Sequence, residues 1–194
     1  MSIILGEPLN VMTLTGESDQ SKVVLLLDYA SSAVRSYTRQ TLSEETTTDV
    51  LRGTWGPVLE LPQRPVSDVD SVSIDGVAVT GWEWDGLQGI RSSGWVAGES
   101  SGQGAGGCTP GNWGGPQTVV SVTYTHGWPF DELPGEITMI TEGLAALALS
   151  TPAGVRTESI GSYSVTYSIE SMGSVPRVAI HDAKVLDRYR RRWL

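Results

Sequence analysis

The spacing of the apolar residues changes twice along this chain of 194 residues. From 18 to 42 they recur every three or four positions, the pattern of one face of an amphipathic helix. The same spacing returns from 134 to 150, behind a Pro suited to a first helical turn. The segment between them alternates with a period of two. The sequence therefore predicts an α+β fold: a small helical bundle with an inserted antiparallel β-hairpin region and a C-terminal helix.

The strongest turn signal is Asp75-Gly76, which stands between alternating runs at 66–74 and 77–82. An Asp-Gly pair suits a type I′ hairpin turn, because both central residues need a positive φ. Further strands are expected at 87–91 and 118–125. Strict alternation divides the first strand into two faces, one with Val66, Asp68, Asp70, Val72 and Ile74 and the other with Val69, Ser71 and Ser73.

Residues 94–117 contain nine glycines and neither Lys nor Arg. This composition predicts a loop insertion between neighbouring strands of a single domain, 1–194, rather than a separate module. Trp95 and Trp113 lie in this loop and are candidates for contact with a neighbouring subunit, since Trp is enriched in interfaces. The loop would then become ordered on assembly.

The C-terminal residues 177–194 differ in charge from everything before them. They carry six basic and two acidic residues, whereas residues 1–176 carry seven basic and twenty acidic residues, and the whole chain has a net charge of −9. A strand or hairpin arm is expected at 160–169 and a helix at 178–193. This helix and tail are a candidate docking element, with an apolar stripe and arginines whose forked donors suit carboxylates on a partner, namely Val185, Leu186, Arg188, Tyr189, Arg190, Arg191, Arg192 and Trp193.

The sequence offers no arrangement typical of catalysis. His126 and His181 lie far apart with no second ligand at metal spacing, and Cys108 has a glycine-rich setting that supplies no base. Asp68 and Asp70 have the spacing to share one face of a strand, which suits a cation, but a solvated face is the commoner explanation. We therefore expect no enzyme activity, no cofactor and no metal site.

The compartment and the general partners follow from composition. No cationic start with an apolar core marks a signal peptide, and the aliphatic runs are too short to cross a membrane. We expect a protein that is made in the cytoplasm and does not bind membranes. The acidic body also disfavours general nucleic-acid binding, because phosphate neutralisation needs Lys and Arg.

Five segments, in order, resemble the head-to-tail adaptor (head-tail connector) proteins of tailed bacteriophages. Residues 28–39 read DYASSAVRSYTR, like the first helix of that family, and 61–76 read LPQRPVSDVDSVSIDG, like its strand and turn. Residues 122–128 with 133–137 (VTYTHGW and LPGEI) are similar to its next strand and helix start. Residues 161–167 (GSYSVTY) and 186–192 (LDRYRRR) complete the order, and the glycine-rich insertion departs from it.

The resemblance implies a ring of twelve subunits docked to the portal protein in the virion neck, assembled in the host cytoplasm. A stopper or tail-completion protein would be the next partner, and packaged DNA would pass through the lumen without specific binding. An acidic lumen would repel that DNA and let it slide. A head-completion or stopper protein is the nearest alternative. Because of Trp82, Trp84, Trp95 and Trp113, a β-rich carbohydrate-binding module is another.

Overall fold

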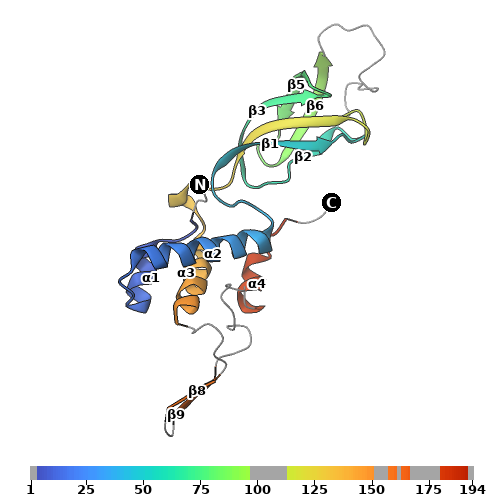
Figure 1. The fold of residues 1–194 in the computed structure, drawn as a ribbon. Coiled ribbons are helices and arrows are strands. Elements are labelled where there is room, and N and C mark those ends of the chain that lie inside the picture. The colour runs from blue at the N-terminus through green and yellow to red at the C-terminus, as the bar shows by residue number, and fades with distance from the viewer. Residues whose placement is uncertain (1–3, 97–112, 151–156, 161–162, 167–179, 192–194) are drawn as a thin grey trace. The chain divides into compact units, whose positions relative to one another are not determined.

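A computed structural model describes residues 4–96, 113–150, 157–160, 163–166 and 180–191 of the chain. These residues form two compact units, one of Met1–Gln40 with Phe130–Leu194 and one of Thr41–Pro129. The second unit is inserted between two helices of the first. Both helices and antiparallel sheets are present, so the predicted α+β class is confirmed (Figure 1).

The first unit, here called the helical unit, contains α1 (Pro8–Thr15), α2 (Gln20–Thr38), α3 (Gly135–Ser150) and α4 (Ile180–Leu186). The short 3-10 helix η1 (Phe130–Glu132) precedes α3, and β8 (Thr157–Ile160) pairs with β9 (Tyr163–Thr166) in an antiparallel hairpin. The helix α2 crosses the other three, and α1 and α3 also pack against each other (Figure 1).

The ends of α2 follow from local chemistry. Asp19, the residue before the helix, accepts hydrogen bonds from the backbone N–H of Ser21 at 3.0 Å and of Lys22 at 3.3 Å. These bonds satisfy two donors that have no partner within the helix. Its core-facing side carries Val23, Leu27, Ala30, Ser31, Val34 and Thr38, all buried.

The helix α1 was not predicted from the sequence. Contacts with α3 hold it: Oε1 of the buried Glu142 accepts hydrogen bonds from the backbone N–H of Glu7 at 2.9 Å and from Nδ2 of Asn10 at 3.0 Å. A carboxylate at the first turn also complements the positive end of the α1 dipole. The position of α1 therefore depends on a residue 135 positions away in the chain.

The second unit, here called the β unit, consists of two antiparallel sheets. One has the order β1-β7-β3-β4, from β1 (Glu45–Arg52), β7 (Val119–His126), β3 (Val66–Ile74) and β4 (Val77–Ala78). The other has the order β2-β6-β5, from β2 (Val58–Glu60), β6 (Gly89–Val96) and β5 (Thr80–Trp84). Apolar residues of both sheets form one buried core.

The Asp75-Gly76 turn is confirmed, with a positive φ at both residues, 47° and 82°. The expected faces of β3 are wrong, however. Register shifts between Val66 and Asp68 and between Val69 and Ser71 each place an additional residue in the strand. Because of these bulges, the residues that reach the core are Val66, Val69, Val72 and Ile74, while Asp68 and Asp70 are exposed.

Candidate interaction surface of the C-terminal segment

The segment 187–191, which follows α4, is bound to the C-terminal end of α2. The backbone N–H of Arg191 donates to the carbonyl of Thr38 at 2.9 Å, and Nε2 of the buried Gln40 donates to the carbonyl of Tyr189 at 2.7 Å. A helix leaves its last carbonyls without partners, and Arg191 satisfies one of them here. The segment is thereby fixed to the helical unit through backbone atoms.

A tyrosine on α2 adds side-chain contacts to this attachment. The hydroxyl of Tyr37 donates to Oδ1 of Asp187 at 2.7 Å, and the guanidinium of Arg190 lies 5.3 Å from the centre of the Tyr37 ring. Such a distance is typical of a cation–π interaction. The hydrogen bond to the Asp187 carboxylate raises the pKa of Tyr37, because the bond is lost when the phenol ionises.

The other side of the segment contacts the first turn of α3. The Tyr189 hydroxyl donates to Oε2 of Glu136 at 3.1 Å, and a terminal nitrogen of Arg188 lies 3.4 Å from Oε1. Partial burial, and then the bond to Glu136, raise the pKa of Tyr189. The C-terminal end of α2 and the N-terminal end of α3 thus both hold residues 187–191 in place.

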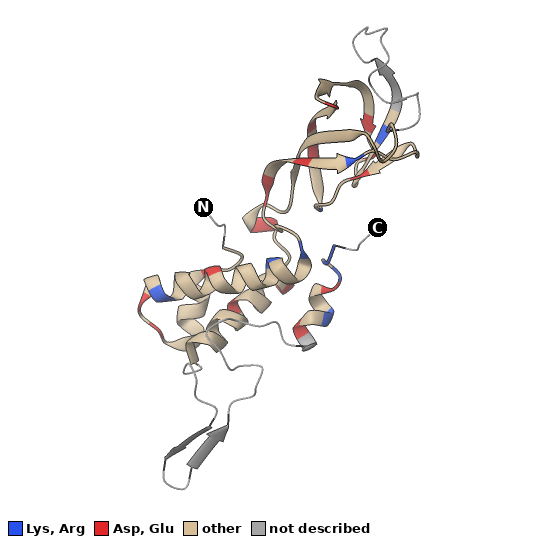
Figure 2. Cartoon of the chain, turned by 45° about the vertical axis from the view of Figure 1, so that its right-hand side comes forward, with Lys and Arg blue, Asp and Glu red and all other residues tan. Residues whose placement is uncertain are grey.

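These contacts place the arginines of the segment beside the C-terminal end of α2, which carries two more. Lys and Arg colour both the segment after α4 and the C-terminal end of α2 (Figure 2). Arg188, Arg190 and Arg191 come from the segment, Arg35 from the last turn of α2, and Arg39 is the residue that caps this helix. The ion pairs of Arg188 and Arg190 are solvent-exposed, and such pairs contribute only about 0–1 kcal/mol. Their guanidinium groups can exchange these partners for carboxylates or phosphates of another molecule at little cost.

The candidate docking residues divide into three groups in the structure. Arg188 and Arg190 are exposed, and Val185, Tyr189 and Arg191 are partly buried. Leu186 is 0% exposed because α4 packs against α2 and α3, so this side chain belongs to the core and not to an apolar surface stripe. Arg192 and Trp193 lie outside the described residues. The helix itself ends at Leu186, earlier than expected, and turns follow it.

Trp113 does not lie on a loop surface. It is 1% exposed in the core of the β unit, and its indole N–H donates to the carbonyl of Pro57 at 3.2 Å. Its backbone N–H donates to the carbonyl of Thr54 at 2.9 Å. The expected insertion is also shorter at both ends, because β6 continues to Val96 and residues 113–117 are held against the sheet. Trp95 belongs to β6, and its side chain lies outside the described part.

The tryptophans weaken the case for a carbohydrate-binding module. Trp82 and Trp84 pack against the same core as Trp113, so none of these three offers a fully exposed ring for stacking on a sugar. Among the side chains of the β unit that the structure describes, Trp55 is an exposed aromatic residue, at 70%, and sequence reasoning had not considered it.

His126 is a buried titratable group of the β unit. It is 1% exposed, its Nε2 lies 3.1 Å from Oγ1 of Thr47, and burial lowers its pKa. The hydroxyl of the neighbouring Tyr124 donates a hydrogen bond to Oδ2 of Asp49 at 2.6 Å, so this carboxylate already has a partner. His181 and Cys108 lie outside the side chains that the structure describes. Among the described residues, no group of three or more His, Cys, Asp or Glu is arranged to hold a metal ion.

Sequence reasoning missed a second apolar face of α2. Leu25 and Tyr29 are 54% and 48% exposed, and their spacing of four places them on one side of the helix. The same helical spacing that predicts the buried stripe also places these two residues on one face, but only the longer buried stripe was interpreted.

None of the helices that the structure describes has the length and hydropathy of a membrane span.

No known protein family and no curated protein matches this sequence. Solved structures do match its fold. A chain in the neck of an empty gene transfer agent (GTA) particle, computed with C6 symmetry, has a TM-score of 0.57 and 16% identity, covering 96% of this chain and 90% of its own. A chain in the virion of the native GTA particle has a TM-score of 0.53 and 18% identity, covering 92% and 81%.

A third match is a chain in the neck of the native GTA particle, computed with C12 symmetry. Its TM-score is 0.51 at 19% identity, and the match covers 88% of this chain and 84% of that one. At such low identities these matches establish a shared fold. That fold extends over most of the described helical and β units and not over one of them alone.

Proposed function

We propose that this chain is a structural subunit of the neck of a tailed-phage-like particle, where it forms a head-to-tail adaptor ring docked to the portal protein. The observation that carries the proposal is the likeness of fold over 96% of the chain to a protein of a GTA neck. The same fold in a neck computed with C12 symmetry supports a ring. The role is structural and not catalytic.

The C-terminal segment is the proposed portal-docking element. Residues 187–191 are fixed by their backbone and tyrosine contacts, so binding would have to order the exposed side chains of Arg188 and Arg190 but not the backbone that carries them. A carboxylate-rich partner surface would replace their weak pairs with Glu136 and Asp187 by charge-assisted hydrogen bonds.

The charge of the β unit is consistent with a channel that lets DNA pass. Residues 41–129 carry three basic and ten acidic residues, a net charge of −7. Phosphates are repelled by such a surface, and DNA passing it would not be held. We expect no retardation of duplex DNA by the purified protein in a mobility-shift assay at low salt. Retardation that is lost on replacing the C-terminal arginines would instead assign those residues to DNA.

The docking proposal is tested by sedimentation of the purified chain with portal rings of the same particle. Co-sedimentation as a closed ring is expected. Replacement of Arg188, Arg190, Arg191 and Arg192 by Ala should abolish it while the circular dichroism spectrum stays unchanged. The matched control replaces Arg52 and Arg91, two exposed arginines of the β unit, and should co-sediment like the wild type.

Two results would contradict the docking proposal. Full binding by the four-arginine variant would exclude the C-terminal segment as the docking element. A chain that ignores the portal but binds tail proteins of the particle would be a stopper or head-completion protein.

A further inference from the structure

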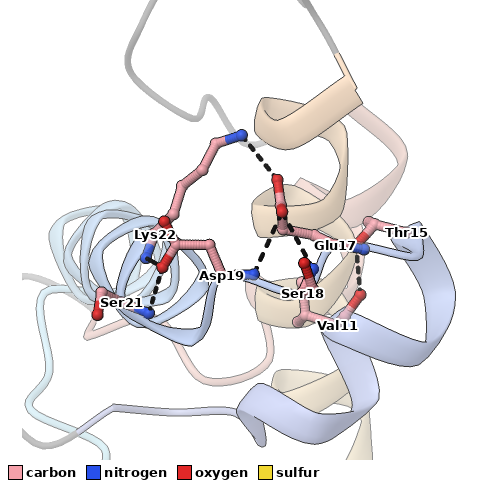
Figure 3. A network of polar contacts seen from close by, with 7 residues as sticks. All are labelled: Val11, Thr15, Glu17, Ser18, Asp19, Ser21 and Lys22. Carbon is pink, nitrogen blue, oxygen red and sulfur yellow. Dashed lines mark hydrogen bonds and ion pairs between the residues drawn. The ribbon is translucent and has the colours of Figure 1, made fainter.

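Backbone groups at both ends of α2 have partners within the chain. In the turn between α1 and α2, Oε1 of Glu17 accepts from the backbone N–H of Ser18 at 3.0 Å and of Asp19 at 3.2 Å (Figure 3). At the other end of α2, the carbonyl of Thr38 accepts from the backbone N–H of Arg191. Folded proteins normally satisfy their backbone donors and acceptors in this way. A strand edge that lacks such partners is therefore a place where another chain can bind.

Most edge strands of the β unit are protected against the addition of a further strand. The strands β2 and β4 contain only three and two residues. The strand β5 is interrupted by a register shift between Thr80 and Trp82. Very short or bulged edge strands are devices that prevent pairing with other chains. The remaining edge strand of the two sheets is β1, and it has neither device.

The strand β1 has a long and regular outer edge. All eight of its residues, from Glu45 to Arg52, pair with β7 without a register shift. In an antiparallel pair, about half of the backbone N–H and C=O groups of an edge strand point away from its partner. Among the described residues, no backbone hydrogen bond joins this outer edge of β1 to another segment. The outer edge of β1 thus presents a row of free donors and acceptors.

The side chains of β1 do not block this edge. The strand contains neither Lys nor Pro, and its exposed residues between the two ends are the uncharged Thr46, Thr48 and Val50. The carboxylate of Asp49 already accepts from the hydroxyl of Tyr124. Exposed charges and prolines are the usual means of preventing strand addition, and β-branched residues such as Thr and Val favour it.

The hairpin of β8 and β9 offers free strands of the same kind. It is a sheet of two strands, and among the described strands no third one pairs with it. A two-stranded hairpin is only marginally stable in water, so pairing with a further strand would stabilise it. The strand β9 (Tyr163–Thr166) contains no charged residue, whereas β8 contains Glu158. The strand β9 is therefore better suited to pair with an edge.

The two faces of the sheet at β1 differ in chemistry. On the exposed face, hydroxyl groups pair across β1 and β7, Thr46 with Thr125 and Thr48 with Thr123, each at 2.8 Å. On the opposite face, Leu51 packs against the core of the β unit. A strand that extends this sheet should therefore alternate between hydroxyl and apolar residues.

The sequence of β9 has this alternation. Ser164 and Thr166 are two residues apart, so they share one face and would extend the row of hydroxyl groups. Tyr163 and Val165 share the other face and would lie on the same side as Leu51. The pattern is thus complementary to β1 on both faces.

We propose that β9 of one copy adds to the outer edge of β1 in a second copy of this chain, and that this strand addition joins neighbouring subunits of the ring. The inference rests on the proposed function and specifies the contact that builds it. Because β1 and β9 are different strands, each copy gives its β9 to one neighbour and its β1 to the other. A contact of this heterologous kind can close into a ring, whereas a symmetric β1–β1 pair would give a dimer.

Amide hydrogen exchange of the free chain and of rings assembled on the portal tests the pairing through the backbone. We expect the amides of β1 that point away from β7, which alternate along the strand, to exchange at least about tenfold more slowly in the ring. The amides of β4, the short edge of the same sheet, are the control and should not change. Rings in which the outward amides of β1 exchange as in the free chain would overturn the inference.

Cross-linking identifies the strand that binds. In a Cys108→Ser background, Val50→Cys and Ser164→Cys are introduced together, rings are assembled on the portal, and a short bifunctional thiol reagent is added. We expect a ladder of covalent oligomers. Val77→Cys replaces Val50→Cys in the matched control and should give no ladder, since Val77 is 52% exposed but lies in β4.

Two cross-linking results would overturn the choice of partner. A covalent dimer formed by Val50→Cys alone would assign the edge to a symmetric β1–β1 pair. A cross-link between Val50→Cys and Ser164→Cys within single chains only would show that the hairpin binds the edge of its own copy.

Variants that block the edge provide an independent test. Thr48→Lys with Val50→Lys places two charges on exposed positions of β1, and Val165→Pro removes a backbone donor from β9. Each variant should need at least about tenfold more protein to form rings, while its circular dichroism spectrum stays close to that of the wild type. Leu87→Lys, at a leucine of the β unit that is 73% exposed, is the control and should assemble normally.

The outcomes separate this inference from the adaptor function. Normal rings on the portal with both kinds of variant would refute the strand addition and leave the adaptor function intact. A cross-linked ladder in protein that never binds the portal would support the strand addition and refute the portal partner.

Discussion

Trp113 provides the sharpest stability test, because the sequence assigned it to a neighbouring subunit and the structure places it in the core. A buried Trp removes about 150–250 Å² from water, which at about 25 cal/mol per Å² is worth about 4–6 kcal/mol as an upper estimate. Its indole hydrogen bond to Pro57 adds about 1 kcal/mol. Trp→Ala substitutions in cores cost about 3–5 kcal/mol. We therefore expect Trp113→Ala to lower the free energy of unfolding of the β unit by about 4 kcal/mol.

Amide hydrogen exchange measures this change for each unit separately. Slowly exchanging amides of β7 should lose protection by about the same free energy, whereas those of α2 should not change. Trp113→Phe, which keeps most of the buried ring and loses the indole N–H, is the matched control and should cost about 1–2 kcal/mol. A cost below about 1 kcal/mol for Trp113→Ala, with loss of ring assembly, would refute the core assignment and restore the subunit-contact interpretation.

Three further predictions concern single sites. Burial lowers the pKa of His126, so the unfolded chain binds a proton at this residue more readily than the folded chain does. The free energy of unfolding, measured by urea titration, should therefore fall as the pH drops below about 6.5. The variant His126→Phe should lack this change. Asp19→Ala removes the acceptor for the Ser21 N–H and should cost about 1 kcal/mol in thermal unfolding, whereas Asp19→Asn should cost less. Gly127→Ala should destabilise the β unit by at least about 2 kcal/mol in urea unfolding, since its φ is +89° and an added Cβ would lie 2.2 Å from the Ser43 carbonyl oxygen.

Local signals predicted most of the larger elements. The helical spacing at 18–42 and 134–150 located α2 and α3, and the alternation around Asp75-Gly76 located β3 and its turn. These elements are long enough for the spacing of their apolar residues to distinguish a helix from a strand.

The features that the sequence did not predict depend on contacts between residues far apart in the chain. The helix α1 is short, and it is held through Glu142, which no local pattern reveals. The face of β3 that is buried depends on two bulges, which are set by pairing with β7. Strict alternation gave Asp68 and Asp70 the same face as the core residues Val66 and Val72, whereas the bulged strand exposes both carboxylates.

The candidate docking surface was predicted in part. Composition alone identified the arginines after α4, because charge in this chain changes sign there. Composition did not identify Arg35 and Arg39 as neighbours of that segment, since they come from the other end of the chain. Periodicity also assigned Leu186 to a surface, and only the packing of α4 against α2 and α3 shows that it is buried.

The location of this chain within an assembled particle tests the central claim most directly. Electron cryomicroscopy of particles that contain it, with the portal and tail resolved, would show where its helical and β units fit. The proposal predicts a closed ring of copies in the neck, with residues 187–191 against the portal. Density for the chain elsewhere in the particle, or a neck ring built from another protein, would contradict the account.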